Sequence, residues 1–162
     1  MSVSGLERFK EAQDQRVSGF DSALSEIRAG GKRSHWIWYV FPQLTGMGYS
    51  AMSQKYGLEG IDEAEDYLRD PVLRSRLLTI ATAVARQIDQ QGSGSLERVM
   101  GSSIDVAKLV SSMTLFGDLA AKLHATEGLD EHASIAAVAA RILAVAAAEG
   151  YPACQFTLGR LR

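Results

Sequence analysis

The sequence predicts an all-α fold: a single irregular multi-helix bundle in which residues 1–162 form one domain. Three observations lead to this prediction. Apolar residues recur every three or four positions over long stretches, capping residues stand where these stretches begin, and glycines stand where they end. At 162 residues, the chain has the usual size of one domain and is long enough to bury one core.

Two helices are predicted in the first part of the chain. Ser4 and Glu7 have the spacing of a capping box, in which each side chain satisfies a free backbone amide at the start of a helix. A helix over residues 14–29 follows, ended by Gly30 and Gly31. Its apolar stripe consists of Val17, Phe20, Leu24 and Ile27.

The clearest helix signal begins at Asp70, which has the position of an N-cap, with Pro71 in the first helical turn. Apolar residues then recur at helical spacing as far as Ile88, and Gly92 closes the pattern. The glycine and serine residues at 92–95 predict a surface loop, because four residues are too few to mark a domain boundary.

Two further helices are predicted in the second half of the chain. Ser102 and Asp105 open one helical pattern, which Gly117 is expected to break or bend. An alanine-rich stretch with an apolar stripe predicts a last long helix from Ser134 to Ala148, ending at Gly150.

The sequence HWIWYVF at residues 35–41 fits either a helix or a strand. We favour a helix, because a lone strand needs a partner and no second strand is evident. The choice matters for Trp36 and Trp38. A strand places both rings on one face, whereas a helix turns them about 200° apart and sends one ring to the core.

Composition excludes several classes of function. Seventeen basic and nineteen acidic residues give a net charge of −2, so we expect no nucleic-acid partner. The single Cys154 allows no internal disulfide and gives no metal-ligand spacing, so no metal site and no cofactor are predicted. The absence of a signal sequence and of any run of eighteen apolar residues predicts a cytoplasmic protein that does not enter membranes.

Residues 30–50 hold the densest collection of polar and aromatic side chains. Two glycines, the cations Lys32 and Arg33, and free amides near Ser34 would together attract an anion such as phosphate or carboxylate. The structural alternative is that Gly30 ends a helix and that the cations lie beside the negative C-terminal end of that helix.

Other residues extend this candidate site. His35 would serve as a general base, or else be packed against its aromatic neighbours. Lys108 and Ser111 lie three residues apart on one helical face, although serines within helices usually bond to the backbone. The full predicted ligand-binding set is Lys32, Arg33, His35, Trp36, Trp38, Gln43, Ser50 and Lys108.

Three remaining features are given structural interpretations. His124 and His132 are expected in a solvated loop, because their spacing does not fit a metal site. Gly46, Gly48 and Ala51 fit a dinucleotide-binding motif, but no alternation of strands and helices accompanies them. Cys154 is either a reactive thiol or a buried residue.

The stretch GKRSHWIWYVFPQLTGMGYS, together with LERFKEAQ, EAEDYLRDPVLRSRL and DVAKLVSSMTLF, resembles domain-of-unknown-function family 1810, some members of which have been labelled calpastatin. The resemblance implies an irregular bundle of helices and no established activity. The chain departs from the family near its end, where Cys154 and its neighbours lack an aspartate that the family tends to have. A remote likeness to glycosidase-like proteins acting on ADP-ribose derivatives is also noted.

Two functional hypotheses follow. In the first, the protein binds a small anionic or nucleotide-derived ligand of the ADP-ribose type in a polar and aromatic pocket, and whether it is also an enzyme stays open. In the second, it is a protein-interaction module without catalytic activity. A pocket would gather the polar residues around one concavity, whereas an interaction surface would leave aromatic residues on a flat exposed patch.

Overall fold

The computed structural model describes residues 5–162, which form ten α-helices and no strand, so the all-α prediction is confirmed. The helices are α1 (Glu7–Gln13), α2 (Phe20–Arg28), α3 (Ile37–Val40), α4 (Ala51–Tyr56), α5 (Ile61–Arg69), α6 (Pro71–Gln91), α7 (Leu96–Met100), α8 (Ser103–Glu127), α9 (Asp130–Ala148) and α10 (Gln155–Leu161).

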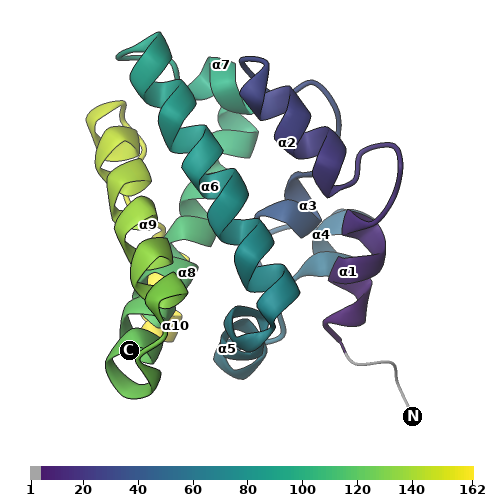
Figure 1. Cartoon of the computed structure of the whole chain (residues 1–162), viewed down its shortest axis with the longest axis vertical. Coiled ribbons are helices and arrows are strands. Elements are labelled where there is room, and N and C mark those ends of the chain that lie inside the picture. The colour runs from purple at the N-terminus through teal and green to yellow at the C-terminus, as the bar shows by residue number, and fades with distance from the viewer. Residues whose placement is uncertain (1–4) are drawn as a thin grey trace.

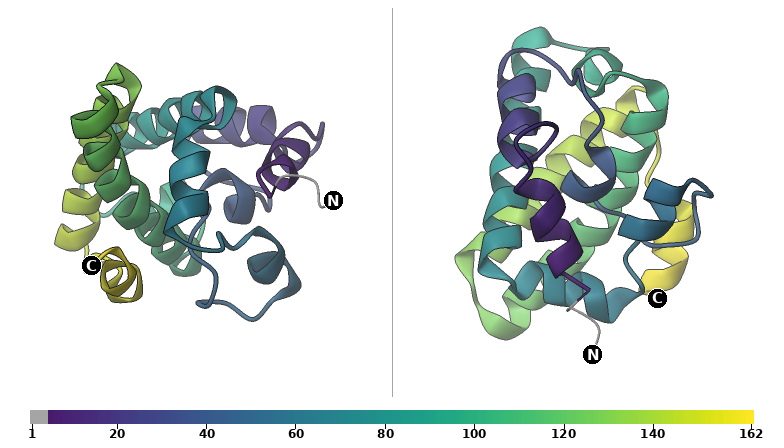
Figure 2. Two further views of the ribbon diagram at one scale, coloured as in Figure 1. Left: turned by 90° about the horizontal axis from the view of Figure 1, so that it is seen from below. Right: turned by 90° about the vertical axis from the view of Figure 1, so that its right-hand side faces the viewer.

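Of the three longest helices, α6 crosses the middle of the molecule and α9 lies along its left edge in Figure 1. Helices α8 and α9 are joined by a turn at Gly128, whose φ is +74°, and pack against each other. Helix α6 packs on α9 and α2. The shorter helices α1, α3 and α4 lie at the other side of α6 from α9 (Figures 1 and 2).

One continuous hydrophobic cluster fills the bundle, with members from Phe9 in α1 to Ala146 in α9. Trp36, Tyr67 and Phe116 are among its largest fully buried side chains. Phe156 of α10 packs against the cluster from outside. All ten helices therefore enclose or cover the same core.

Helix α6 begins and ends as the sequence predicts. The Asp70 carboxylate accepts hydrogen bonds from the amides of Val72 and Leu73, both at 3.0 Å, and Pro71 occupies the first turn. Gly92 follows the last residue with a φ of +86°, a conformation that favours glycine. The residues after it form the predicted loop, although Ser95 is buried.

The predicted break at Gly117 is wrong, because α8 continues without interruption to Glu127. A Cβ atom at Gly117 would lie only 2.9 Å from the Cβ of Ala139 in α9. Glycine is therefore present at this position because two helices pack closely there. Its low helix propensity does not end the helix when both neighbouring turns are held by tertiary packing.

The predicted helix over residues 14–29 is too long, since α2 begins only at Phe20. Ser18 has a φ of +60°, and Val17 is 78% exposed and takes no part in an apolar stripe. The chain turns so tightly before α2 that no Cβ fits at Gly19 beside the Gln15 carbonyl oxygen. The capping box at Ser4 lies outside the described residues, and α1 begins at Glu7.

The aromatic segment adopts the favoured helical conformation, but only for the single turn of α3. Trp36 is fully buried, whereas Trp38 is half-buried, as expected for rings that point in different directions. One isolated parallel bridge links Leu44 to Leu58 outside the helices. Helices α4, α5, α7 and α10 were not predicted. Three of them are seven residues or shorter and α5 has only nine, and short helices carry weak periodicity.

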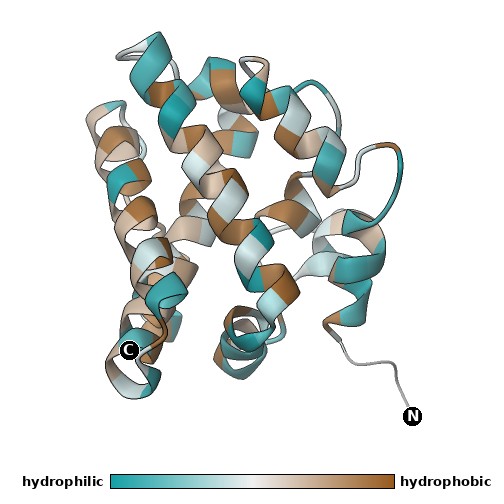
Figure 3. Cartoon of the chain, in the orientation of Figure 1, coloured by the Kyte–Doolittle hydropathy of each residue, from teal (hydrophilic) through white to brown (hydrophobic). Residues whose placement is uncertain are grey.

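Helix α9 begins four residues before the predicted start at Ser134. By length and composition alone it would be able to cross a membrane, and hydrophobic residues dominate it in Figure 3. Its buried stripe, which includes Ile135 and Ile142, packs on α8 and α6, and 28% of its apolar window is buried inside the protein.

The expectation of a solvated His132 is wrong. Because α9 begins at Asp130, His132 lies in its first turn and is only 1% exposed. Its Nε2 donates to the Leu68 carbonyl at 2.9 Å, at the end of α5. His124, in the last turn of α8, is exposed as expected.

Candidate functional site

The eight predicted site residues lie in separate places. Four lie in the turn between α2 and α3, namely Lys32, Arg33, His35 and Trp36. Three line one cleft, namely Trp38, Gln43 and Lys108. Ser50 caps α4 and hydrogen-bonds the hydroxyl of Ser53, which also lines the cleft.

The turn between α2 and α3 binds a carboxylate of the protein itself. One oxygen of Glu26 accepts hydrogen bonds from the amides of Arg33 and Ser34 at 2.8 and 2.9 Å and from Trp36 Nε1 at 2.9 Å. The other oxygen accepts from the Ser34 hydroxyl at 2.6 Å. The amides that the sequence assigned to an external anion therefore donate to Glu26.

Burial by itself raises the pKa of the Glu26 carboxyl group, but the hydrogen bonds from Ser34 and Trp36 and from the backbone amides outweigh it. Together they lower the pKa from 4.5 to about 2. Donors that are already fixed around an anion favour its charged form. Glu26 is therefore ionised at neutral pH and holds the turn closed.

Lys32 is also engaged within the protein. Its Nζ lies 2.8 Å from a carboxylate oxygen of Asp105 and donates to the Ser34 carbonyl at 2.6 Å, and its side chain is only 6% exposed. It lies 5.1 Å from the centre of the Trp36 ring. This cation ties the turn to the start of α8. Arg33 and His35 are exposed beside it.

The cleft lies between residues 38–57 and the first half of α8, and Cys154, just before α10, lines one end. Its wider part has a volume of about 330 Å³. Aromatic side chains of Trp38, Phe41 and Tyr56 line the narrow part, whose volume is only about 10 Å³. Met47, Ile104 and Cys154 line the wider part.

Lys108 carries the positive charge of this cleft. Its ammonium group forms no ion pair or hydrogen bond with any residue from 5 to 162, and none of the lining residues is acidic. The Gln43 side-chain amide has no hydrogen-bond partner in the same described part of the chain. The cleft thus offers one cation and one amide beside aromatic surface, a set suited to an anionic ligand with a ring.

Cys154 lies at the end of the cleft, half-buried, in a cluster of sulfur and hydroxyl groups. Its sulfur lies 3.6 Å from Met47 Sδ and accepts from the Thr157 hydroxyl at 3.3 Å. Burial raises the pKa of the thiol, but hydrogen bonds from Thr157 and Ser111 outweigh it, so the pKa is lowered. More of this thiol is ionised at a given pH than of an ordinary cysteine.

Ser111 contacts this cluster and not a base. Its Oγ lies 3.3 Å from Thr157 Oγ1 and 3.5 Å from Met47 Sδ, and no hydrogen bond links it to Lys108. This geometry gives no lysine-activated serine. Residues 5–162 contain no group of three or more side chains able to hold a metal ion.

Gly46 and Gly48 serve the packing of the cleft wall. Gly46 has a φ of +106°, and a Cβ there would lie 3.1 Å from the Phe156 ring of α10. A side chain at Gly48 would overlap Ser53. The glycines allow the loop to pack closely against both α4 and α10.

The family model described as protein of unknown function (DUF1810) matches residues 3–137 of the chain. The chain belongs to this family. No curated protein matches it.

A solved structure extends the DUF1810 likeness over nearly the whole chain. The conserved hypothetical protein Rv1873 from Mycobacterium tuberculosis is 33% identical in sequence, with a TM-score of 0.70, over 95% of this chain and 94% of that chain. The DUF1810 match itself ends at residue 137, so α10 and Cys154 lie beyond it.

Sequence reasoning overlooked several residues of this DUF1810 cleft, among them Met47, Ser53 and Ile104. No local pattern marks these side chains as neighbours, and Met47 meets Cys154 across 107 positions of the chain. One signal was available in the sequence: Lys108 and Ser111 were already placed on one helical face, and this face lines the cleft.

Proposed function

We propose that this DUF1810 protein binds a small molecule that combines a planar ring with an anionic group. One observation carries the proposal: Lys108 has no partner in the described chain and faces a cleft with aromatic and no acidic lining. A partly buried cation without a counter-ion costs free energy, which a bound anion offsets. Nucleotide-derived ligands of the ADP-ribose type have both features.

Each lining group has a role in this proposal. The Lys108 ammonium binds the anionic group, the exposed part of the Trp38 ring packs against the ligand ring, and the Gln43 amide orients it. A volume of about 330 Å³ is near the lower end of ligand pockets. A ligand as large as ADP-ribose would therefore place only one part inside the cleft.

A thermal-shift screen with nucleotides, ADP-ribose, nicotinamide cofactors and sugar phosphates tests the proposal. A ligand at one hundred times its Kd stabilises the fold by about 2.7 kcal/mol, which raises the Tm by roughly 5 to 10 °C. We expect Lys108→Gln to abolish this shift. Lys122→Gln, which removes the same charge from the exposed far half of α8, should retain it.

The His35→Ala variant tests whether the ligand binds in the cleft or at the neighbouring turn between α2 and α3. His35 is exposed and does not line the cleft, so its loss should leave the ligand-induced shift unchanged. If the ligand-induced rise in Tm persists in Lys108→Gln but is absent in His35→Ala, the cleft assignment is refuted. The ligand would then bind at the turn between α2 and α3.

Two exposed apolar side chains favour a second candidate function, a protein-interaction module. Tyr49 is 92% exposed and Ile104 is 66% exposed, and both belong to segments that border the cleft. Exposed apolar side chains that form one contiguous patch mark contact surfaces. If no small molecule shifts the Tm, Tyr49→Asp should abolish capture of a protein partner that wild type retains.

A further inference from the structure

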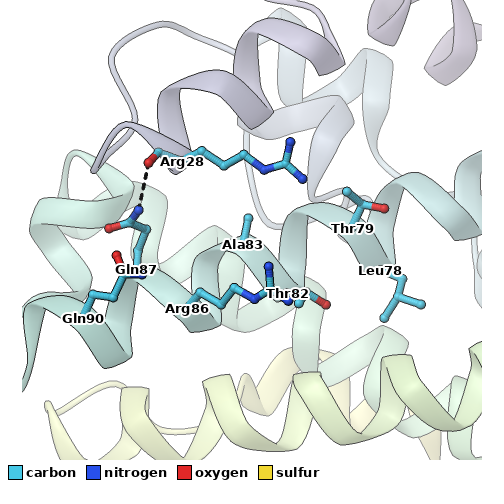
Figure 4. A pocket seen from close by; sticks show the side chains of 8 residues that line it. All are labelled: Arg28, Leu78, Thr79, Thr82, Ala83, Arg86, Gln87 and Gln90. Carbon is cyan, nitrogen blue, oxygen red and sulfur yellow. Dashed lines mark hydrogen bonds between the residues drawn. The ribbon is translucent and has the colours of Figure 1, made fainter.

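A second concavity lies between α2 and α6 and shares no residue with the cleft (Figure 4). It is an open groove with a volume of about 510 Å³. Arg28 extends into it from α2 and Arg86 from α6, and Figure 4 shows their guanidinium groups on either side of Ala83. Polar groups of Thr79, Thr82 and Gln90 complete the lining.

The charge of this groove is uncompensated. Neither Arg28 nor Arg86 forms an ion pair within residues 5–162, and none of the lining residues is acidic. Two other arginines of α6 behave differently. Arg74 lies 2.8 Å from Glu131 and Arg76 lies 2.8 Å from Asp14. Of the three arginines of α6, only Arg86, which lines the groove, is unpaired within the described residues.

The backbone that carries Arg28 is fixed in place. The side chain of Gln87, which is 9% exposed, donates to the Arg28 carbonyl at 3.0 Å (Figure 4). Gln91 donates to the Gly30 carbonyl at 2.7 Å and to the side-chain oxygen of Gln87 at 3.0 Å. These bonds hold the end of α2 against α6, so the two arginines face the same space before any ligand arrives.

We infer that this groove binds the phosphate group of a small molecule, as a phosphate ester or a diphosphate. Guanidinium groups donate paired hydrogen bonds to phosphate oxygens. The Thr82 hydroxyl and the Gln90 amide, which have no hydrogen-bond partner in the described chain, supply further donors. The net charge of −2 gives the chain no overall attraction for a long polyanion, and two arginines match one phosphate or diphosphate, so the inferred ligand is a small molecule and not a nucleic acid.

Inorganic pyrophosphate is the probe that tests this inference, titrated into the full-length protein by isothermal calorimetry at low ionic strength. Arg28→Gln and Arg86→Gln should each weaken binding by roughly tenfold or more, and the double variant should show no binding. Arg16→Gln removes the same charge from an exposed position before α2, where its side chain has no partner in the described chain. It should bind as wild type does.

The Lys108→Gln variant shows whether pyrophosphate binds in this groove or in the cleft of the proposed function. If pyrophosphate binding is lost in Lys108→Gln and retained in the Arg28 and Arg86 double variant, the phosphate belongs to the cleft and the inference is overturned. Absence of binding to wild type overturns it as well. An oligonucleotide that binds more tightly than pyrophosphate, with the same arginine dependence, would overturn the assignment to a small molecule.

Discussion

Glu26 shows how one side chain decides the conformation of a whole segment. Its carboxylate accepts four hydrogen bonds from the turn between α2 and α3, and one of the donors is the indole of the fully buried Trp36. Without this acceptor, the indole N–H would be left without a partner next to the core. An unsatisfied buried donor is costly.

Glu26→Ala should lower the free energy of unfolding by roughly 1.5 to 3 kcal/mol at pH 7, measured by urea denaturation. The folded-state pKa is about 2, below the ordinary 4.5. Ionised Glu26 therefore contributes its full stability above about pH 4.5, and loses it as the pH falls towards 2. The difference between wild type and variant should narrow over this range.

Glu11→Ala is the matched control, because Glu11 is exposed on α1 and has no partner in the described chain. Its effect should stay within about 0.5 kcal/mol. A difference between wild type and Glu26→Ala that stays constant from pH 7 to pH 3 would mean that the carboxylate charge has no role in holding the turn.

The sequence identified the right chemistry in this turn but not the partner. Free amides of Arg33 and Ser34 do bind an anion, and that anion is Glu26. Lys32 does pair with a carboxylate, and that carboxylate is Asp105, more than seventy positions away. Local spacing indicates which groups need a partner, whereas the fold decides which partner they meet.

At the scale of the helix, local signals were reliable where the helix end depends on its own residues. Asp70 caps α6 and Ser102 caps α8, whose Asp105 amide donates to the Ser102 hydroxyl. Gly117 was misinterpreted because its reason lies in another helix. Propensity is a weak guide where two helices pack against each other.

Gly117→Ala should therefore reduce stability, although alanine favours a helix over glycine by about 1 kcal/mol. The new Cβ would lie 2.9 Å from the Cβ of Ala139, so α8 and α9 would have to separate. We expect a net loss of about 1 kcal/mol in urea denaturation. Introduced into an Ala139→Gly background, where the obstacle is absent, the same change should stabilise the protein.

Gly159→Ala provides the comparison, since a Cβ at this helical position of α10 meets nothing within 4 Å. This variant should gain up to about 1 kcal/mol from propensity alone. If Gly117→Ala were equally stabilising, close packing of α8 on α9 would not be the reason for the glycine.

At the scale of the whole molecule, the cleft combines parts of the chain that no local pattern connects. Trp38 and Gln43 come from its first third, Lys108 from α8, and Cys154 from its end. The sequence suggested the first three and gave two interpretations of the fourth. It offered no signal that Met47 and Cys154 would meet, because their contact depends on how α10 folds back onto α8.

The same long-range packing predicts that the described residues, 5–162, unfold as one domain. A single hydrophobic cluster runs from Phe9 to Ala146, and ion pairs such as Arg8 with Glu63 and Arg74 with Glu131 join helices that are distant in sequence. No helix has a core of its own to retain once this cluster opens. Unfolding should therefore be cooperative, even though the chain slightly exceeds the usual size for two-state behaviour.

Scanning calorimetry measures the cooperativity of unfolding directly. An average globular protein absorbs about 0.7 kcal/mol per residue on unfolding, so this chain should show one transition of roughly 110 kcal/mol, with equal calorimetric and van't Hoff enthalpies. Two resolved transitions would divide the chain into separate units. Because the cleft is built from both ends of the chain, such a division would also mean that it forms only after those units dock. A single transition would instead mean that the cleft and the core unfold together. A ligand bound in the cleft would then stabilise all the helices at once.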